Sequence, residues 1–301
     1  MSIDFCGLKL AHPVINGSGT FDAIAAGDVF GSALRESFPF AAYVSKTITV
    51  KARAGNPPPR LWETGAGMIN SIGLPNKGVD AYMRDDLPRL TGLRCAEVQD
   101  GGPPAPVPVI TNVMGSTVQE ISHLLGACDA APEIEAIELN VSCPNVKTGL
   151  DIGADPAQLR EVVQAVRPLT AKPLIVKLTP NTADVSLCAR AAQDAGADAV
   201  SLINTLRAMA LAPADGATPR TRWLGGGTGG LSGPAIRAVA LAQVAAVAGA
   251  VGIPVIGMGG VQSAAHARDL LDAGATLVAV GTESFRDPAV GTRIARGLCT
   301  P

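Results

Sequence analysis

Short apolar runs rich in β-branched residues recur along the whole chain. Each run is continuous rather than alternating, a pattern typical of strands that are buried on both faces of a parallel sheet. Eight such runs are present, at residues 13–17, 42–46, 108–113, 136–141, 173–178, 199–204, 254–259 and 277–282.

The segments between most of these runs are rich in Ala, Leu, Arg and Glu and have helical periodicity. Clear examples are residues 156–169, 182–195, 234–247 and 263–273. Strands that alternate with helices indicate an α/β fold with a parallel sheet, and eight such units fit a (β/α)8 TIM barrel better than a doubly wound sheet. We therefore expect a single barrel domain over residues 1–301.

Most of the apolar runs end in a polar residue or a glycine. In a (β/α)8 barrel the carboxyl ends of all strands meet at one face, where active sites lie. The residues that we expect at this face are Ser18, Lys46, Asn112, Asn140, Lys177, Asn204, Gly259 and Thr282. Their convergence is the strongest physical indication of a site in the sequence.

Two longer excursions interrupt the alternation, at about residues 49–78 and 205–231. Long loops in a compact domain are commonly functional. The second excursion contains a Gly-x-Gly-x-x-Gly pattern within residues 225–230, but a loop precedes it and an Ala/Val-rich helix follows, whereas a dinucleotide fingerprint needs a strand before and an acidic residue after. We therefore reject a dinucleotide site and expect a mobile loop here, with Gly233 leaving room for a ligand.

Glycine-rich turns follow the seventh and eighth runs. They contain Gly259, Gly260, Gly281 and Thr282. Backbone amides at such turns hold phosphate groups well, and the loops after strands seven and eight are the usual phosphate site of barrels. Tight turns without a ligand are the alternative.

Two lysines, Lys46 and Lys177, end apolar runs, where a charged group is costly without a partner. Each lysine either pairs with a neighbouring acid or contributes to binding a cofactor that is anchored by its phosphate. We favour the second interpretation. A cation beside a flavin ring would stabilise its anionic reduced form.

A cysteine, Cys143, lies two residues after the fourth run. An ordinary thiol has a pKa near ~8.5, so a modest influence of its surroundings makes it a proton acceptor at neutral pH. The histidines His12, His123 and His266 are not placed at a strand end, which leaves Cys143 as the candidate base. Asp155 precedes Pro156 and is explained as a helix N-cap.

Composition narrows the class of protein. The chain has 301 residues, 47% of them apolar, and a net charge of -2, which gives no signature of nucleic-acid binding. No run reaches the ~18 apolar residues of a membrane-spanning helix, and the N-terminus lacks a signal peptide, so we expect a cytoplasmic protein without a membrane partner. No cysteine pair has C-x-x-C spacing, so no metal site is expected.

Several motifs, in this order and spacing, resemble those of class 1 dihydroorotate dehydrogenases over essentially the full length of the chain. A cysteine at position 143 is similar to class 1, whereas the membrane-associated class 2 has serine there. The segments around 203–206 and 230–235 are most similar to subclass 1B. The motifs are Lys46-Thr47, Gly55-Asn56-Pro57-x-Pro59-Arg60, Asn70-Ser71-Ile72-Gly73-Leu74, Asn140-Val141-Ser142-Cys143-Pro144-Asn145, Val176-Lys177-Leu178-Thr179-Pro180-Asn181, Ile203-Asn204-Thr205, Gly230-Leu231-Ser232-Gly233-Pro234-Ala235 and Gly257-Met258-Gly259-Gly260.

The resemblance implies an oxidoreductase that uses one FMN per chain to oxidise (S)-dihydroorotate to orotate in de novo pyrimidine (UMP) biosynthesis. The residues implied for FMN are Ser18, Lys46, Thr47, Asn112, Asn140, Lys177, Ile203, Gly233, Gly259, Gly260, Gly281 and Thr282. Those implied for the substrate are Lys46, Asn70, Ser71, Ile72, Gly73, Leu74, Asn140, Asn204 and Thr205. Asparagine amides suit this substrate because each can both donate and accept a hydrogen bond.

The resemblance also implies a mechanism. Cys143 would remove the C5 proton while C6 delivers a hydride to flavin N5. The loop over residues 142–153 would act as a lid that seats the thiol and excludes water.

Subclass 1B enzymes pass electrons to NAD through a second subunit that carries FAD and a [2Fe–2S] cluster. This chain has no cysteine grouping for such a cluster, so NAD as acceptor requires a partner subunit, and a heterotetramer built on a homodimer is expected. A fumarate-dependent class 1A homodimer is the first alternative. A tRNA-dihydrouridine synthase-like enzyme, which would need a basic surface and a helical extension, and a silent barrel that only binds a phosphorylated ligand are the others.

Overall fold

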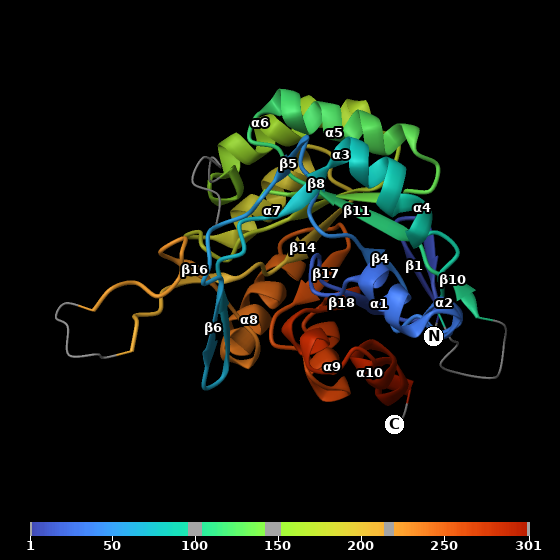
Figure 1. Ribbon diagram of the computed structural model, residues 1–301. Coiled ribbons are helices and arrows are strands. Elements are labelled where there is room, and N and C mark those ends of the chain that lie inside the picture. The colour runs from blue at the N-terminus through green and yellow to red at the C-terminus, as the bar shows by residue number, and fades with distance from the viewer. Residues whose placement is uncertain (1, 96–103, 142–151, 214–219, 300–301) are drawn as a thin grey trace.

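The computed structural model describes residues 2–95, 104–141, 152–213 and 220–299. All eight predicted runs form strands of one parallel sheet, which curls into the barrel of Figure 1. The strands are β3 (Val14–Asn16), β4 (Tyr43–Val44), β11 (Val109–Val113), β12 (Ala136–Asn140), β13 (Leu174–Lys177), β14 (Ala199–Leu202), β17 (Val255–Met258) and β18 (Leu277–Val280). Their order in space is β3-β18-β17-β14-β13-β12-β11-β4, which confirms the predicted TIM barrel.

The barrel closes between its two terminal strands, β3 and β4, through a side chain. The Asn16 Nδ2 donates to the Val44 carbonyl oxygen and the Asn16 Oδ1 accepts from the Val44 amide, each at 2.8 Å. One backbone bond, from the Ala41 amide to the Val14 oxygen at 3.0 Å, supports the same seam. The side chain of Asn16 therefore replaces part of a strand ladder.

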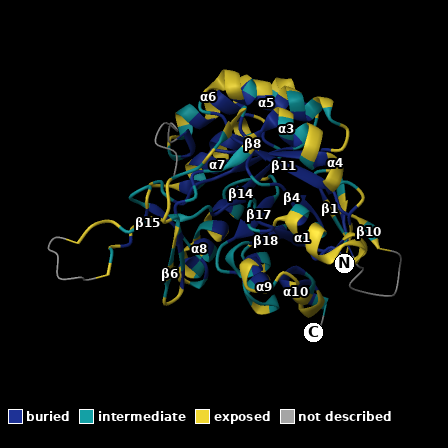
Figure 2. Ribbon diagram, viewed as in Figure 1, coloured by how far each residue is buried: buried dark blue, intermediate teal, exposed yellow. Residues whose placement is uncertain are grey.

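Helices cover the outside of the barrel, and Figure 2 shows buried strands surrounded by helices whose outer faces are exposed. The helices predicted after the fourth, fifth, sixth and seventh strands are all present. Asp155 caps α6 as expected, because its Oδ1 accepts from the Ala157 and Gln158 amides. The covering helices are α5 (Val118–Ala130), α6 (Pro156–Val166), α7 (Val185–Asp194), α8 (Arg237–Ala248), α9 (Ala264–Asp272) and α10 (Val290–Cys299).

Smaller elements complete the chain. Short helices lie between the first strands and between the second and third. These are α1 (Ala23–Phe30), α2 (Ser32–Glu36), α3 (Val79–Ala81), the short π-helix Tyr82–Asp86 and α4 (Leu87–Leu90). Single 3-10 turns are Ile152–Ala154, Arg167–Leu169, Pro234–Ile236 and Thr282–Phe285. Three two-stranded pairs are β1 (Ile3–Phe5) with β2 (Leu8–Leu10), β5 (Lys51–Arg53) with β8 (Asn76–Gly78), and β9 (Arg94–Cys95) with β10 (Ala105–Pro106). No helix in these described ranges is long and apolar enough to cross a bilayer.

The inside of the barrel is layered. An apolar cluster fills its lower part and includes Phe5 and Leu10 of the β1–β2 hairpin, which are buried beneath strand residues such as Ile110 and Ile175. Because side chains alternate along a strand, the residue two positions after an inward residue also points inward. The polar residues that follow in this way are Asn112, Glu138 and Lys177 on neighbouring strands and Ser201 on the next one.

Strands from the two excursions pair with one another in one antiparallel sheet. Its strands are β6 (Leu61–Thr64), β7 (Gly67–Asn70), β15 (Leu206–Ala208) and β16 (Gly229–Ser232), in the order β15-β16-β7-β6. The expectation of a mobile loop over the glycine-rich segment is therefore wrong for its last residues. Gly229 and Gly230 belong to β16, and a Cβ at either would collide with Asn70 or Thr205. The glycines serve close packing of strands.

His12 lies at the amino-terminal end of the strands, away from the predicted site. Its ring is buried, with Nδ1 accepting from the Val14 amide at 3.2 Å and Nε2 3.2 Å from the Cys95 Sγ. Burial lowers the pKa of His12 to about 4 and raises that of Cys95 to about 12. Both groups are thus neutral at pH 7, as a structural role requires.

His12 makes the stability of the fold sensitive to acid. In the unfolded chain the imidazole takes up a proton below its ordinary pKa of 6.5, whereas the folded protein keeps it neutral down to about pH 4. The contribution of His12 is complete above pH 6.5 and is lost as the pH falls through this window, by up to about 3 kcal/mol. Urea unfolding between pH 7 and pH 4 should therefore be less steeply pH-dependent in His12→Gln than in the wild type. Replacement of the exposed His123 by Gln is the control, and identical pH slopes in the two variants would contradict the assignment.

Candidate active site

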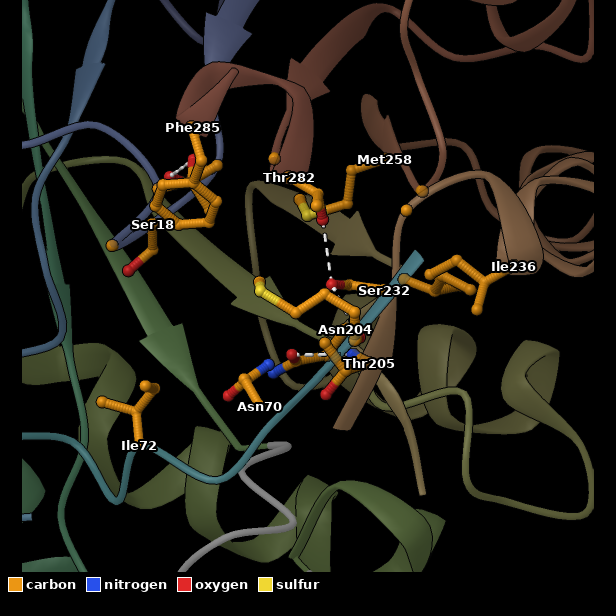
Figure 3. Close-up of a pocket in the computed structure, with 18 of the residues that line it drawn as sticks. Ser18, Asn70, Ile72, Asn204, Thr205, Ser232, Ile236, Met258, Thr282 and Phe285 are labelled. Atoms are coloured by element: carbon orange, nitrogen blue, oxygen red, sulfur yellow. Dashed lines mark hydrogen bonds between the residues drawn. The ribbon is translucent and has the colours of Figure 1, made fainter. Parts of the chain in front are cut away.

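A cavity of about 570 Å³ opens at the carboxyl ends of the barrel strands. The strand ends form its floor, and the sheet of the two excursions forms one wall. Figure 3 shows residues from both parts facing the same space, with Ser18, Thr282 and Met258 on one side and Asn70, Asn204 and Thr205 on the other. The predicted convergence of polar strand ends is therefore present in the structure.

Both predicted lysines, Lys46 and Lys177, line the cavity. The Lys177 side chain is only 7% exposed, and its Nζ lies 3.9 Å from the Oε2 of Glu138, which is 3% exposed. For Lys177 both interpretations drawn from the sequence apply, because it faces the cavity and also pairs with an acid. Asn140 and Ile203 lie beside it on the floor.

The predicted phosphate turns lie together at one end of the cavity. Gly233, Gly259, Gly260, Gly281 and Thr282 all line it. The Thr282 hydroxyl donates to the Ser232 Oγ at 2.9 Å, a bond drawn in Figure 3. A Cβ added at Gly281 would come no closer than 3.8 Å to any neighbour, so packing leaves space for a ligand at this turn. This arrangement suits a bound phosphate.

The wall opposite is amide-rich. Asn70 donates from Nδ2 to the Gly230 oxygen at 3.2 Å, and the Asn204 Oδ1 accepts from the Thr205 amide at 2.8 Å. Leu74 has a φ of 56°, a conformation that side chains rarely adopt and that recurs where a backbone is held for ligand binding. Ile72 and Gly73 complete the predicted substrate segment along the cavity.

Two predicted site residues do not line the cavity. Asn112 is fully buried one layer below, where its Nδ2 donates to the Glu138 Oε2 and its Oδ1 has no hydrogen-bond partner among the described residues. Ser71 is also fully buried, and its hydroxyl donates to the Thr228 oxygen at 2.8 Å. Ser71 thus joins the two excursions behind the wall.

A supporting residue that the sequence did not reveal is Asn181. Its Nδ2 donates to the Thr205 oxygen at 3.0 Å, and its Oδ1 accepts from the Arg207 amide at 2.9 Å. Asn181 follows β13, the fifth barrel strand, and its two hydrogen bonds hold the segment that contains Asn204 and Thr205 in place. Spacing alone gives no sign of this contact.

Other lining residues were also not predicted. Some of these residues are adjacent in the sequence to predicted site residues, and this adjacency is the signal that could have revealed them. Leu61, Met68 and Phe285 reach the cavity through the excursion sheet and the last 3-10 turn, whose positions no periodicity discloses. The full set is Gly17, Gly19, Thr20, Leu61, Met68, Ser232, Pro234, Ile236, Met258, Val261, Gln262, Glu283 and Phe285.

Cys143 and most of the predicted lid lie outside the described residues. The two ends of that loop are joined, because the Gly153 amide donates to the Val141 oxygen at 3.0 Å. Val141 directly follows the cavity residue Asn140. The loop therefore starts and ends at the edge of the floor.

The described cysteines do not compete for the role of base. Burial raises the pKa of Cys6 to about 11 and that of Cys95 and Cys128 to about 12, and it also raises the pKa of Cys188. None of these thiols lines the cavity. Within the ranges that the structure describes, no group of three His, Cys, Asp or Glu residues could hold a metal ion.

Comparisons with known proteins agree along the entire chain. A family model described as "Dihydroorotate dehydrogenase" matches residues 1–300. The "Dihydroorotate dehydrogenase B (NAD(+)), catalytic subunit" of Geotalea uraniireducens is 44% identical over 301 residues, which is 100% of this chain and 92% of that protein. Proteins with the same description from Citrifermentans bemidjiense and Desulforudis audaxviator are each 44% identical over 99% of this chain and cover 92% and 91% of their own lengths.

Proposed function

The chain belongs to the dihydroorotate dehydrogenase family, and on that premise we propose that it is the catalytic subunit of an enzyme that oxidises (S)-dihydroorotate to orotate in pyrimidine biosynthesis. The observation that carries the proposal is the cavity at the strand ends. It combines an end with glycine-rich turns, a floor with two lysines and an amide-rich wall, an arrangement that suits a phosphorylated cofactor and a small polar substrate together.

FMN fits this cavity. Gly281 has room for a phosphate beside Gly260 and Thr282. Ser18, Thr47 and Ile203 also line the cavity. When bound, FMN would supply the acceptor for the hydride that leaves C6 of the substrate.

The residues of the wall would bind and orient the substrate. Asn70, Asn204 and Thr205 offer amide and hydroxyl groups that both donate and accept, which matches the imide of dihydroorotate. Lys46 would face the negative carboxylate of the substrate from the floor. Ile72 and Leu74 would exclude water from the apolar edge of the substrate.

Cys143 is the proposed base. Its thiolate would take the proton from C5 as the C6 hydride leaves, and the loop joined at Val141 and Gly153 would bring the sulfur over the substrate. Asn140, three residues earlier in the sequence, would hold both ligands at the point of reaction.

The electrons would pass to NAD through a partner subunit that carries FAD and a [2Fe–2S] cluster. Relatives described as catalytic subunits of an NAD(+) enzyme support this acceptor. A homodimer of this chain with two partner subunits is the assembly that we propose. Direct use of fumarate by the homodimer is the alternative.

One experiment tests the proposal. The purified chain should be yellow, and its flavin absorbance should bleach on addition of dihydroorotate without oxygen. Parallel assays with an artificial acceptor, NAD+ and fumarate should give turnover with the artificial acceptor alone. A colourless protein that binds no FMN would contradict the function, whereas turnover with fumarate would contradict only the proposed acceptor.

The phosphate end gives a separate prediction. Thr282→Val keeps the shape of the side chain but removes the hydroxyl that lies at the glycine turns. We expect FMN to bind about tenfold more weakly, since a hydrogen bond to a charged group contributes about 1.5–3 kcal/mol. Fluorescence titration of the apoprotein with FMN measures the change. Thr91→Val, at a half-buried threonine that does not line the cavity, is the matched control, and equal affinities in both variants would place the phosphate elsewhere.

A further inference from the structure

A carboxylate lies inside the barrel directly beneath the proposed flavin site. Glu138 is in the middle of β12, between the buried Ala136 of the apolar layer and Asn140, which lines the cavity. Its side chain is 3% exposed. A charged group at such a place is costly unless other groups pair with it.

The partners of Glu138 come from three neighbouring strands. The Ser201 hydroxyl on β14 donates to Oε1 at 2.7 Å, and the Asn112 Nδ2 on β11 donates to Oε2. The Nζ of Lys177 on β13 lies 3.9 Å from Oε2. Two donors and one cation are the surroundings that a charged carboxylate needs. An apolar residue would fill the same space without a desolvation cost, so packing alone does not explain the acid.

We propose that Glu138 is a positioning residue that fixes Lys177 and Asn112 under the flavin and offsets the charge of Lys177. This inference rests on the proposed function, because it needs FMN above the floor. An unpaired ammonium beneath the ring would favour the reduced, anionic flavin, and a carboxylate 3.9 Å from the ammonium cancels much of that field. Glu138 thereby keeps the reduction potential of bound FMN lower than Lys177 alone would set it.

The lower reduction potential favours electron transfer out of the flavin. A flavin that holds its electrons less tightly passes them on more readily to an acceptor outside the cavity. Glu138 would therefore favour the second half of the reaction, in which the reduced flavin is reoxidised, without contact with the substrate. The same pair would also orient Asn112, whose amide nitrogen is turned toward Glu138 and whose Oδ1 is left for another donor.

The test is the midpoint potential of bound FMN in Glu138→Gln, measured by reductive titration against a reference dye. Glutamine keeps the size of the side chain and one acceptor oxygen but removes its charge. We expect the equilibrium to shift at least tenfold toward reduced flavin, which is about 30 mV more positive for a two-electron couple. Glu135→Gln, one residue before β12 begins, is the control and should leave the potential unchanged.

A second variant covers the case in which Glu138→Gln does not fold. Glu138→Gln combined with Lys177→Gln removes both charges, so its potential should stay close to that of the wild type. If the double variant had a potential as low as that of Lys177→Gln alone, Glu138 would offset none of the charge of Lys177. An unchanged potential in a folded Glu138→Gln would also overturn the inference. A wild-type protein that binds no FMN would overturn the proposed function. An unchanged potential in FMN-loaded Glu138→Gln would overturn only the inference about Glu138, so the two failures are distinguishable.

Discussion

Replacing Cys143 with alanine is expected to leave FMN bound and to lower turnover with dihydroorotate by about 10²- to 10⁴-fold, the usual contribution of a general base. The substrate proton at C5 then has no acceptor of suitable pKa. Steady-state assays with an artificial acceptor measure the loss, and flavin absorbance measures cofactor content. Full activity of Cys143→Ala at neutral pH would rule out this cysteine as the base.

Two further variants sharpen this result. Cys143→Ser should retain some activity with its optimum at higher pH, because a hydroxyl is a far weaker acid than a thiol and its anion forms only in more alkaline solution. Cys299→Ala, on α10 and outside the cavity, should behave as the wild type. An unchanged pH profile in Cys143→Ser would show that another group removes the proton.

Lys177→Met is expected to destabilise the apoprotein by about 3 kcal/mol and to impair FMN binding. The substitution leaves Glu138 buried without its cation, and breaking a buried ion pair from one side costs about 3–5 kcal/mol. We place the value at the lower end because Ser201 and Asn112 still donate to the carboxylate. Urea unfolding of the FMN-free protein measures the loss without interference from the ligand.

A second substitution should compensate for this loss of stability. Glu138→Gln added to Lys177→Met removes the buried carboxylate charge that has lost its cation. The double variant should regain most of the lost stability but not the affinity for FMN. Lys51→Met, at an exposed lysine on β5, is the control and should change the free energy of unfolding by less than about 0.5 kcal/mol. Additive effects of the two core substitutions would mean that Lys177 and Glu138 are not coupled.

The barrel could be predicted from the sequence because its strands are buried on both faces. Continuous apolar runs at regular intervals leave few other folds, and all eight runs became barrel strands. The polar strand ends such as Lys46, Asn140 and Lys177 were predicted for the same reason, since topology brings them together whatever their contacts.

The excursion sheet could not be predicted in this way. Strand β16 reads Gly-Gly-Leu-Ser and β6 reads Leu-Trp-Glu-Thr, so neither sequence alternates between apolar and polar residues in the way that indicates a strand. The substrate segment that contains Asn70 and Leu74 was identified only through resemblance to a family. Asn112 was expected at the cavity surface because it lies near the end of an apolar run, but the strand register sets it opposite Glu138, one layer below Asn140.

The joining of the two excursions has a consequence for how such chains can change over evolutionary time. Strands β7 and β16, which come from different excursions, are direct neighbours in the sheet, so a shift in the register of one would misplace cavity residues on both. Farther out, Leu211 and Arg222 form an isolated bridge of the second excursion. Residues inserted or deleted between positions 212 and 221 lie beyond this bridge and leave every register unchanged. Chain length is therefore free to vary between these positions, where a lineage can acquire new surface contacts without disturbing its chemistry.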